Sequence, residues 1–119
     1  MTIQHVALET SPADADALVA FFALLGFDEV DPPRTLTERA RWVARGATQI
    51  HVFLADDPVV PPSGHVAVVA PDYDSTLAAL RAAGHPVDER SPHWGSPRSF
   101  VTAPGGHRVE VMAFPPERD

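Results

Sequence analysis

Hydrophobic residues follow strand-like and helix-like spacings in turn along the chain, and the same order of spacings occurs in both halves. Residues 3–8 form a short β-favouring run, followed by apolar residues at the i, i+3, i+4, i+7 spacing of one helical stripe: Leu18, Phe21, Phe22 and Leu25. Strand-like runs come next at residues 27–30, 40–44 and 48–54. The last of these alternates between an aliphatic face and a face that carries Gln49, His51 and Phe53. The first half therefore predicts one strand, one helix and three more strands.

The second half repeats this order. A strand is predicted at residues 65–69, a helix after Pro71 with Leu77 and Leu80 on its buried stripe, and strands at residues 87–90, 99–102 and 108–114. His65 follows His5 by 60 residues, Glu110 follows His51 by 59, and Gly84 follows Gly26 by 58. Three spacings that agree so closely indicate an internal duplication.

Turn residues bound the two predicted helices. Ser11 and Pro12 suit the N-cap and first position of the first helix. Gly26 and Gly84 suit the left-handed residue that ends a helix. We therefore expect one α+β domain over residues 1–119, built from two βαβββ modules at about residues 1–58 and 62–115. The two modules are expected to form a curled mixed sheet around a cleft, with the helices outside.

Composition narrows the class of protein. With 45% hydrophobic residues, the 119-residue chain can bury a real core. The absence of cysteine excludes disulfides and thiolate metal sites, and the absence of lysine excludes Schiff-base chemistry through a lysine side chain. A net charge of −7 with scattered basic residues argues against a nucleic-acid partner. The N-terminus lacks signal-peptide features and no apolar run is long enough to span a membrane, so we expect a cytoplasmic protein with no membrane partner.

Four side chains that can bind a metal occupy matching positions in the two halves. His5 and His65 lie in the first strand of each half, whereas His51 and Glu110 lie in the last strand. A single histidine in a strand is more often structural than a ligand, but the matched register favours one shared site. Imidazole and carboxylate groups suit a divalent ion such as zinc, nickel, iron or manganese. Three or four protein ligands leave positions open for substrate, which is typical of a catalytic metal site.

Four segments, in this order, resemble the vicinal oxygen chelate superfamily, also described as glyoxalase/bleomycin-resistance/dioxygenase proteins. They are Ile3-Gln4-His5-Val6-Ala7-Leu8, residues 18–27, Gly64-His65-Val66-Ala67-Val68, and residues 103–111, which run through a Pro-Gly-Gly turn into the strand with Glu110. The resemblance covers nearly the whole chain. It implies the same duplicated fold, a metal bound at His5, His51, His65 and Glu110, and a homodimer.

One position departs from the superfamily's pattern. His51 stands where glyoxalase I-like members usually have Glu, so the site has one negative ligand fewer. Extradiol dioxygenase-like members bind iron through two His and one Glu. Their pattern implies a triad of His5, His65 and Glu110, with His51 as a fourth ligand or an acid/base group.

Residues near the candidate ligands are predicted to contact substrate. Phe53 and Met112 share strand faces with His51 and Glu110, so they are expected to form an apolar wall. The loop before the strand at residues 99–102 contains His93, Trp94 and Arg98, which are also predicted to contact substrate. His85 and His107 are predicted to be exposed turn residues.

Two functions follow from these expectations. The first is a metal-dependent lyase, isomerase or dioxygenase that chelates two neighbouring oxygens of a small substrate, with Glu110 or His51 moving a proton. The alternative is a metal-free protein that binds a small molecule or an antibiotic, as bleomycin-resistance-like members do. Only 8% of the residues are aromatic, which is few for a cleft that binds by stacking and favours the enzyme.

Overall fold

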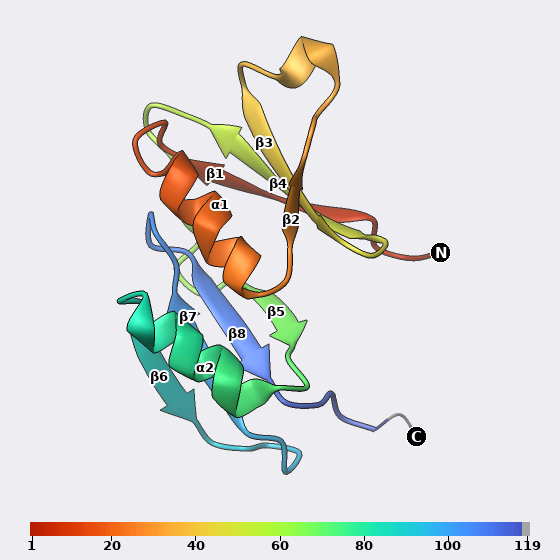
Figure 1. Ribbon diagram of the computed structural model, residues 1–119, viewed down its shortest axis with the longest axis vertical. Helices are drawn as coiled ribbons and strands as arrows, with labels where there is room; N and C mark the ends of the chain where they lie inside the picture. The colour runs from red at the N-terminus through yellow and green to blue at the C-terminus, as the bar shows by residue number, and fades with distance from the viewer. Residues whose placement is uncertain (118–119) are drawn as a thin grey trace. The chain divides into compact units, whose positions relative to one another are not determined.

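Each half of the chain forms its own four-stranded mixed sheet with one helix (Figure 1). The computed structural model describes residues 1–117, and the chain divides into two units, Met1–Val60 and Pro61–Asp119. No helix in the described range is long and apolar enough to cross a membrane. The predicted α+β class with two βαβββ halves is confirmed.

The first unit contains β1 (His5–Thr10), α1 (Ala15–Leu24), β2 (Asp28–Val30), β3 (Ala40–Arg45) and β4 (Thr48–Leu54), with a short 3₁₀ turn at Arg34–Leu36. Its sheet has the order β1-β4-β3-β2. β1 and β4 run parallel, and the other neighbours run antiparallel. The core lies between α1 and the sheet, where Leu18, Phe21 and Phe22 meet the buried side chains Val43, Ile50 and Val52.

The second unit repeats this topology with β5 (Val66–Val69), α2 (Tyr73–Ala82), β6 (Val87–Arg90), β7 (Arg98–Thr102) and β8 (Arg108–Met112). The strand order is β5-β8-β7-β6, and β5 runs parallel to β8. Leu77 and Leu80 of α2 are buried with Val101, Val109 and Val111 of the sheet. The Tyr73 hydroxyl lies 2.6 Å from Ser99 Oγ, which marks the face of β7 that the helix covers.

Because side chains alternate along a strand, each sheet has a second face that points away from its own helix, called the distal face below. In the first unit this face carries His5, Trp42, Gln49, His51 and Phe53. In the second unit it carries Arg98, Phe100, Arg108, Glu110 and Met112. Every predicted metal ligand that lies within a strand is therefore on a distal face, separated from the hydrophobic core by the sheet.

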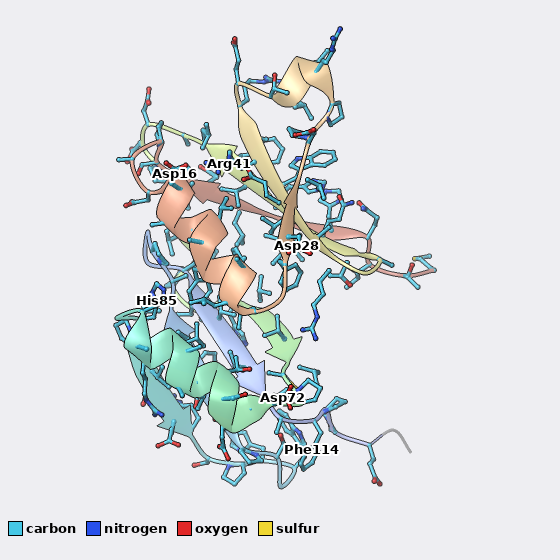
Figure 2. The ribbon with its side chains drawn as sticks, in the orientation of Figure 1. Asp16, Asp28, Arg41, Asp72, His85 and Phe114 are labelled. Carbon is cyan, nitrogen blue, oxygen red and sulfur yellow. The ribbon has the colours of Figure 1, made fainter. Side chains whose placement is uncertain are left out.

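The first strand lies at His5–Thr10, two residues later than predicted, where it pairs with β4. Two further predicted boundaries are also wrong. The first helix begins at Ala15, not Pro12, because Ser11 Oγ donates to Asp14 Oδ2 at 3.0 Å and closes a separate turn before the helix. The last strand ends at Met112, not Phe114. The Ala113 N–H is shared between the Pro97 carbonyl oxygen and Ser96 Oγ, and the Phe114 N–H donates to Ser96 Oγ at 3.1 Å. Phe114 therefore turns off the strand and, with Asp72, lines a pocket of about 460 Å³ (both labelled in Figure 2).

An ion-pair bridge ties α1 to the edge of the first sheet. Arg41 of β3 donates to Asp16 of α1 and to Glu29 of β2, each at 2.6 Å (Figure 2). The bond from Arg41 is the main cause that lowers the pKa of Glu29. The bridge is partly exposed, so its contribution to stability is modest.

Candidate functional site

His65 and Glu110 form a close pair in the second unit. Ala67 of β5 lies directly opposite Glu110 of β8, so His65, just before β5, points along the same distal face. His65 Nε2 lies 3.2 Å from Glu110 Oε1. The Glu110 side chain is 10% exposed, so the pair is partly withdrawn from solvent. The two ligands predicted in this half are thus brought together.

The contact of His65 Nδ1 indicates which ring nitrogen of this histidine carries a proton. Nδ1 lies 2.9 Å from the carbonyl oxygen of Ser63, and a carbonyl can only accept, so Nδ1 carries a proton. In a neutral ring Nε2 then holds a lone pair, which faces an ionised carboxylate oxygen that also only accepts. Two acceptors at this distance need a positive charge, either a proton on Nε2 or a cation shared by both atoms.

This donor set fits a divalent ion. An imidazole with Nδ1–H bound to a backbone carbonyl and Nε2 free is the usual arrangement of a histidine ligand, since the carbonyl fixes the ring's tautomer and orientation. Imidazole and carboxylate together suit a first-row ion. Within residues 1–117 no group of three or more His, Asp or Glu side chains is gathered, so the candidate ligands form two pairs, one in each unit.

Arg98 holds the other side of the Glu110 carboxylate. Its Nη1 donates to Glu110 Oε2 at 2.9 Å, and its Nε donates to the carbonyl oxygen of Ser91 at 2.8 Å. Arg98 is buried, with 9% of its surface exposed. The predicted loop residue Arg98 is therefore the first residue of β7, and it contacts a candidate ligand directly.

In the first unit, His5 and His51 belong to a column of three stacked rings. Trp42 lies directly opposite His51 on β3, and the two ring centroids are 3.7 Å apart with planes 2° from parallel. On the other side, the His5 ring lies 3.9 Å from His51 at 17°. Rings stacked face to face hold their lone pairs in parallel planes, so in this arrangement His5 and His51 do not converge on one ion.

Glutamine side chains orient both rings of this pair. His5 Nδ1 lies 2.7 Å from Gln4 Oε1, and His51 Nε2 lies 2.8 Å from Gln49 Oε1. When each glutamine oxygen accepts a hydrogen bond from the histidine, Nε2 of His5 and Nδ1 of His51 stay available for a ligand. Burial, with the nearby charge of His5 as a second cause, lowers the pKa of His51. Buried His51 is therefore neutral at pH 7.

The other predicted substrate residues are more dispersed. Phe53 is half-buried on the distal face of the first sheet, and Met112 is buried on that of the second, directly opposite Arg98. Exposed His93 lines a pocket with Arg98, whereas the indole N–H of Trp94 donates to the carbonyl of Phe114 at 2.8 Å. Of the two turn histidines, His85 is half-buried and His107 is buried at 4% exposed, so the prediction that they are exposed is wrong.

The structure adds residues that sequence reasoning passed over. Phe100 lies directly opposite Glu110 and occupies in β7 the position that Trp42 occupies in β3 opposite His51. Arg90 and Arg108 lie beside Phe100. The sequence could have indicated that Trp42 and Phe100 are equivalent, because side chains alternate along each strand and the two halves repeat.

Comparisons with known proteins agree with this architecture. A sequence model of the Glyoxalase/Bleomycin resistance protein/Dioxygenase superfamily matches residues 2–111. No curated protein matches the chain. Among solved structures, a glyoxalase family protein from Bacillus anthracis is 23% identical, with 94% of this chain and 93% of that chain covered and a TM-score of 0.83.

Two further solved structures show how varied such relatives are. A lactoylglutathione lyase from Agrobacterium tumefaciens is 22% identical, with 93% of this chain and 92% of that one covered and a TM-score of 0.71. TnmS3, an antibiotic binding protein from Streptomyces sp. CB03234, is 20% identical, with 94% of each chain covered and a TM-score of 0.73. At these identities the likeness shows a shared fold.

Proposed function

The chain belongs to the Glyoxalase/Bleomycin resistance protein/Dioxygenase superfamily, and we propose that it is a divalent-metal-dependent enzyme acting on a small molecule with two neighbouring oxygens. The observation that carries this proposal is the His65–Glu110 pair, in which Nε2 and Oε1 lie 3.2 Å apart while Nδ1 of the histidine is bound to a carbonyl. When bound, a divalent ion would stabilise the negative charge that develops on the substrate's oxygens.

We assign His65 and Glu110 as ligands, and His5 stays the third ligand that the sequence predicts. The assignment of His5 is supported by its matching position in the duplication and by its free Nε2, because Gln4 takes Nδ1. His51 is assigned a different role, since its ring is stacked between Trp42 and His5. The three ligands correspond to the two-His-one-carboxylate set of metal-dependent oxygenases, which leaves positions open for substrate.

The proton-moving group follows from the same contacts. A base needs a free lone pair at neutral pH and a position within reach of the substrate. His51 meets the first condition, because burial lowers its pKa and its Nδ1 is not held by Gln49. Glu110 is the second candidate base. An oxygen-binding ion with one base suits a lyase or an isomerase, and a dioxygenase would in addition need a redox-active ion and molecular oxygen as co-substrate.

Metal content tests the proposal directly. Untagged protein is stripped with a chelator, offered zinc, nickel, iron(II) and manganese in turn, and analysed for metal per chain. We expect about one ion per chain for at least one metal, and below about 0.1 for His65→Ala and Glu110→Ala. His85→Ala, which removes a histidine outside the ligand set, is the matched control. A wild-type protein that holds below about 0.1 ion per chain with all four metals overturns the proposal.

The role of His51 is tested in the same measurement. His51→Ala is expected to keep its metal, whereas His5→Ala is expected to lose most of it. Loss of metal in His51→Ala with retention in His5→Ala would exchange the two assignments.

A second candidate function is metal-free binding of a small molecule. It is favoured by one contact, the bond from Arg98 Nη1 to Glu110 Oε2 at 2.9 Å, which neutralises the carboxylate without an ion. An antibiotic binding protein is among the solved structures with this fold. The metal analysis separates the two candidates. A homodimer and a cytoplasmic location stay predictions.

A further inference from the structure

Three arginines surround one aromatic ring on the distal face of the second sheet. The guanidinium carbons of Arg90, Arg98 and Arg108 lie 5.5, 5.7 and 4.0 Å from the centroid of the Phe100 ring. They come from three adjacent strands, β6, β7 and β8. Arg90 lies directly opposite Arg98 in the register, so two like charges face each other across a strand pair. Such pairs are destabilising unless something neutralises them.

The carboxylates on this face do not balance the arginines. Arg90 pairs with Asp88 at 3.0 Å, but both side chains are largely exposed. Arg98 pairs with Glu110 at 2.9 Å, and that carboxylate also faces His65. Within residues 1–117, Arg108 forms no ion pair. The face therefore carries a surplus of positive charge in a chain whose net charge is −7.

A pocket of about 330 Å³ adjoins two of these arginines, Arg90 and Arg98. It is lined by Glu89, Arg90, Ser91, His93 and Arg98. Its volume is in the range of small-molecule sites. Arg98 is already fixed, because its Nε is bound to the Ser91 carbonyl and its Nη1 to Glu110. A guanidinium that is buried and held in place has lost its side-chain freedom before a ligand arrives, which favours binding.

We propose that Arg90, Arg98 and Arg108 bind the anionic group of a small-molecule ligand, a carboxylate or a tetrahedral phosphorus oxyanion. The planar fork of a guanidinium matches both groups and forms paired charge-assisted hydrogen bonds with them. An anion on this face neutralises the Arg90–Arg98 repulsion and gives Arg108 a partner. The inference rests on the proposed function only where it identifies this anion as part of the enzyme's substrate. Binding of the anion itself needs no metal.

Nuclear magnetic resonance titrations of chelator-treated protein test the inference. Inorganic phosphate and succinate are the probes, with sodium chloride at matched ionic strength as the blank. At least one probe is expected to shift the amide signals of residues 87–102 with a dissociation constant below about 10 mM. Stronger binding of phosphate identifies the phosphorus oxyanion as the preferred group, and stronger binding of succinate identifies the carboxylate.

Single variants locate the site. Arg90→Gln and Arg108→Gln are each expected to weaken the binding by about tenfold, because each removes one charge-assisted contact. Arg34→Gln makes the same charge change at an exposed position of the first unit and is expected to leave the affinity within about twofold of the wild type. Arg98 is left intact in these variants because it also holds Glu110. Circular dichroism establishes that each variant is folded, and Arg108→Lys provides a milder change at the same position.

Three results overturn the inference: shifts no larger than those with chloride, equal weakening by Arg34→Gln, or full affinity in both Arg90→Gln and Arg108→Gln. These failures are separate from failure of the proposed function. A protein that binds metal but no anion contradicts only the inference, and one that binds anion but no metal contradicts only the proposed enzyme.

Discussion

The buried ion pair between Arg98 and Glu110 makes a measurable contribution to the stability of the second unit. Both side chains are 10% exposed, and Nη1 lies 2.9 Å from Oε2. Replacing either residue with Met leaves the other charge without its partner in a largely buried place. Removing one partner of a buried pair costs about 3 kcal/mol or more. Removing both also removes the cost of burying two charges, so the double variant is expected to lose much less than the sum.

A double-mutant cycle with Arg98→Met and Glu110→Met measures this coupling. A charge-assisted hydrogen bond in this setting contributes about 2 kcal/mol, which is the expected coupling free energy. Urea unfolding followed by circular dichroism, in the presence of a chelator, gives the free energy of unfolding for all four proteins. With a urea slope of about 2 kcal/mol/M, each single variant should unfold at about 1.5 M less urea than the wild type.

An exposed ion pair in the same unit provides the control. Arg81 and Glu89 are 3.9 Å apart and mostly exposed, so the same cycle there should give a coupling below about 0.5 kcal/mol. If the coupling of Arg98 with Glu110 is as small as that of the control pair, the two side chains are not paired in solution. Arg98 would then be free to turn, and its fixed orientation toward the anion pocket would be refuted.

Three further predictions concern the first unit. Phe22 is fully buried, so Phe22→Ala should lower the free energy of unfolding by about 3–5 kcal/mol in urea titrations; a loss below about 1 kcal/mol would contradict the packing of α1 on its sheet. Arg41→Met should cost less than about 1 kcal/mol at pH 7, because the bridge is partly exposed. The bond from Arg41 lowers the pKa of Glu29 below 4.5, so this stabilisation is complete above that pH and is lost as the pH falls through the lowered pKa. The difference between wild type and Arg41→Met should therefore shrink on acidification, and a difference that grows would refute the pair. Burial lowers the pKa of His51 below 6.5, and the protonated ring, 3.7 Å from Trp42, should quench the fluorescence of that tryptophan. In chelator-treated protein whose other tryptophan is replaced by phenylalanine, the midpoint of this quenching should therefore lie below pH 6.5. His51→Gln should remove the transition, and a midpoint at or above 6.5 would show that the ring is not buried.

Sequence patterning predicted the elements where alternation and helical spacing were continuous. The strands Thr48–Leu54 and Val87–Arg90 have the expected ends, and Gly26 ends its helix with a φ of +87° as predicted. Two of the boundary errors arise where a serine side chain competes with the backbone pattern. Ser96 Oγ accepts from the Phe114 N–H and shares the Ala113 N–H with the Pro97 carbonyl, and these contacts join residues 17 and 18 positions apart. Local spacing contains no information about such a bond.

The sequence predicted which candidate ligands lie near each other within each half, but it did not predict how their side chains are oriented. The duplication placed His51 and Glu110 at equivalent positions, and the structure brings each next to the histidine of its own half. Stacking of Trp42 on His51 depends on ring rotations that Gln49 helps to set, which residue spacing does not encode. The arginine cluster was missed because its members are separated in sequence and read as scattered charges, although the register of three strands gathers them at Phe100.

The separation of the distal faces from the cores bears on how such a duplicated chain diversifies. Residues such as Gln49 and Arg108 occupy equivalent strand positions, yet one is neutral and the other cationic. Neither position contributes to the hydrophobic packing under the helices, so natural selection can change its chemistry without a penalty to folding. One module carries a column of rings on its distal face, and the other carries a cluster of arginines. Single substitutions on one distal face can therefore change which ligand is preferred while the cores of both modules stay the same.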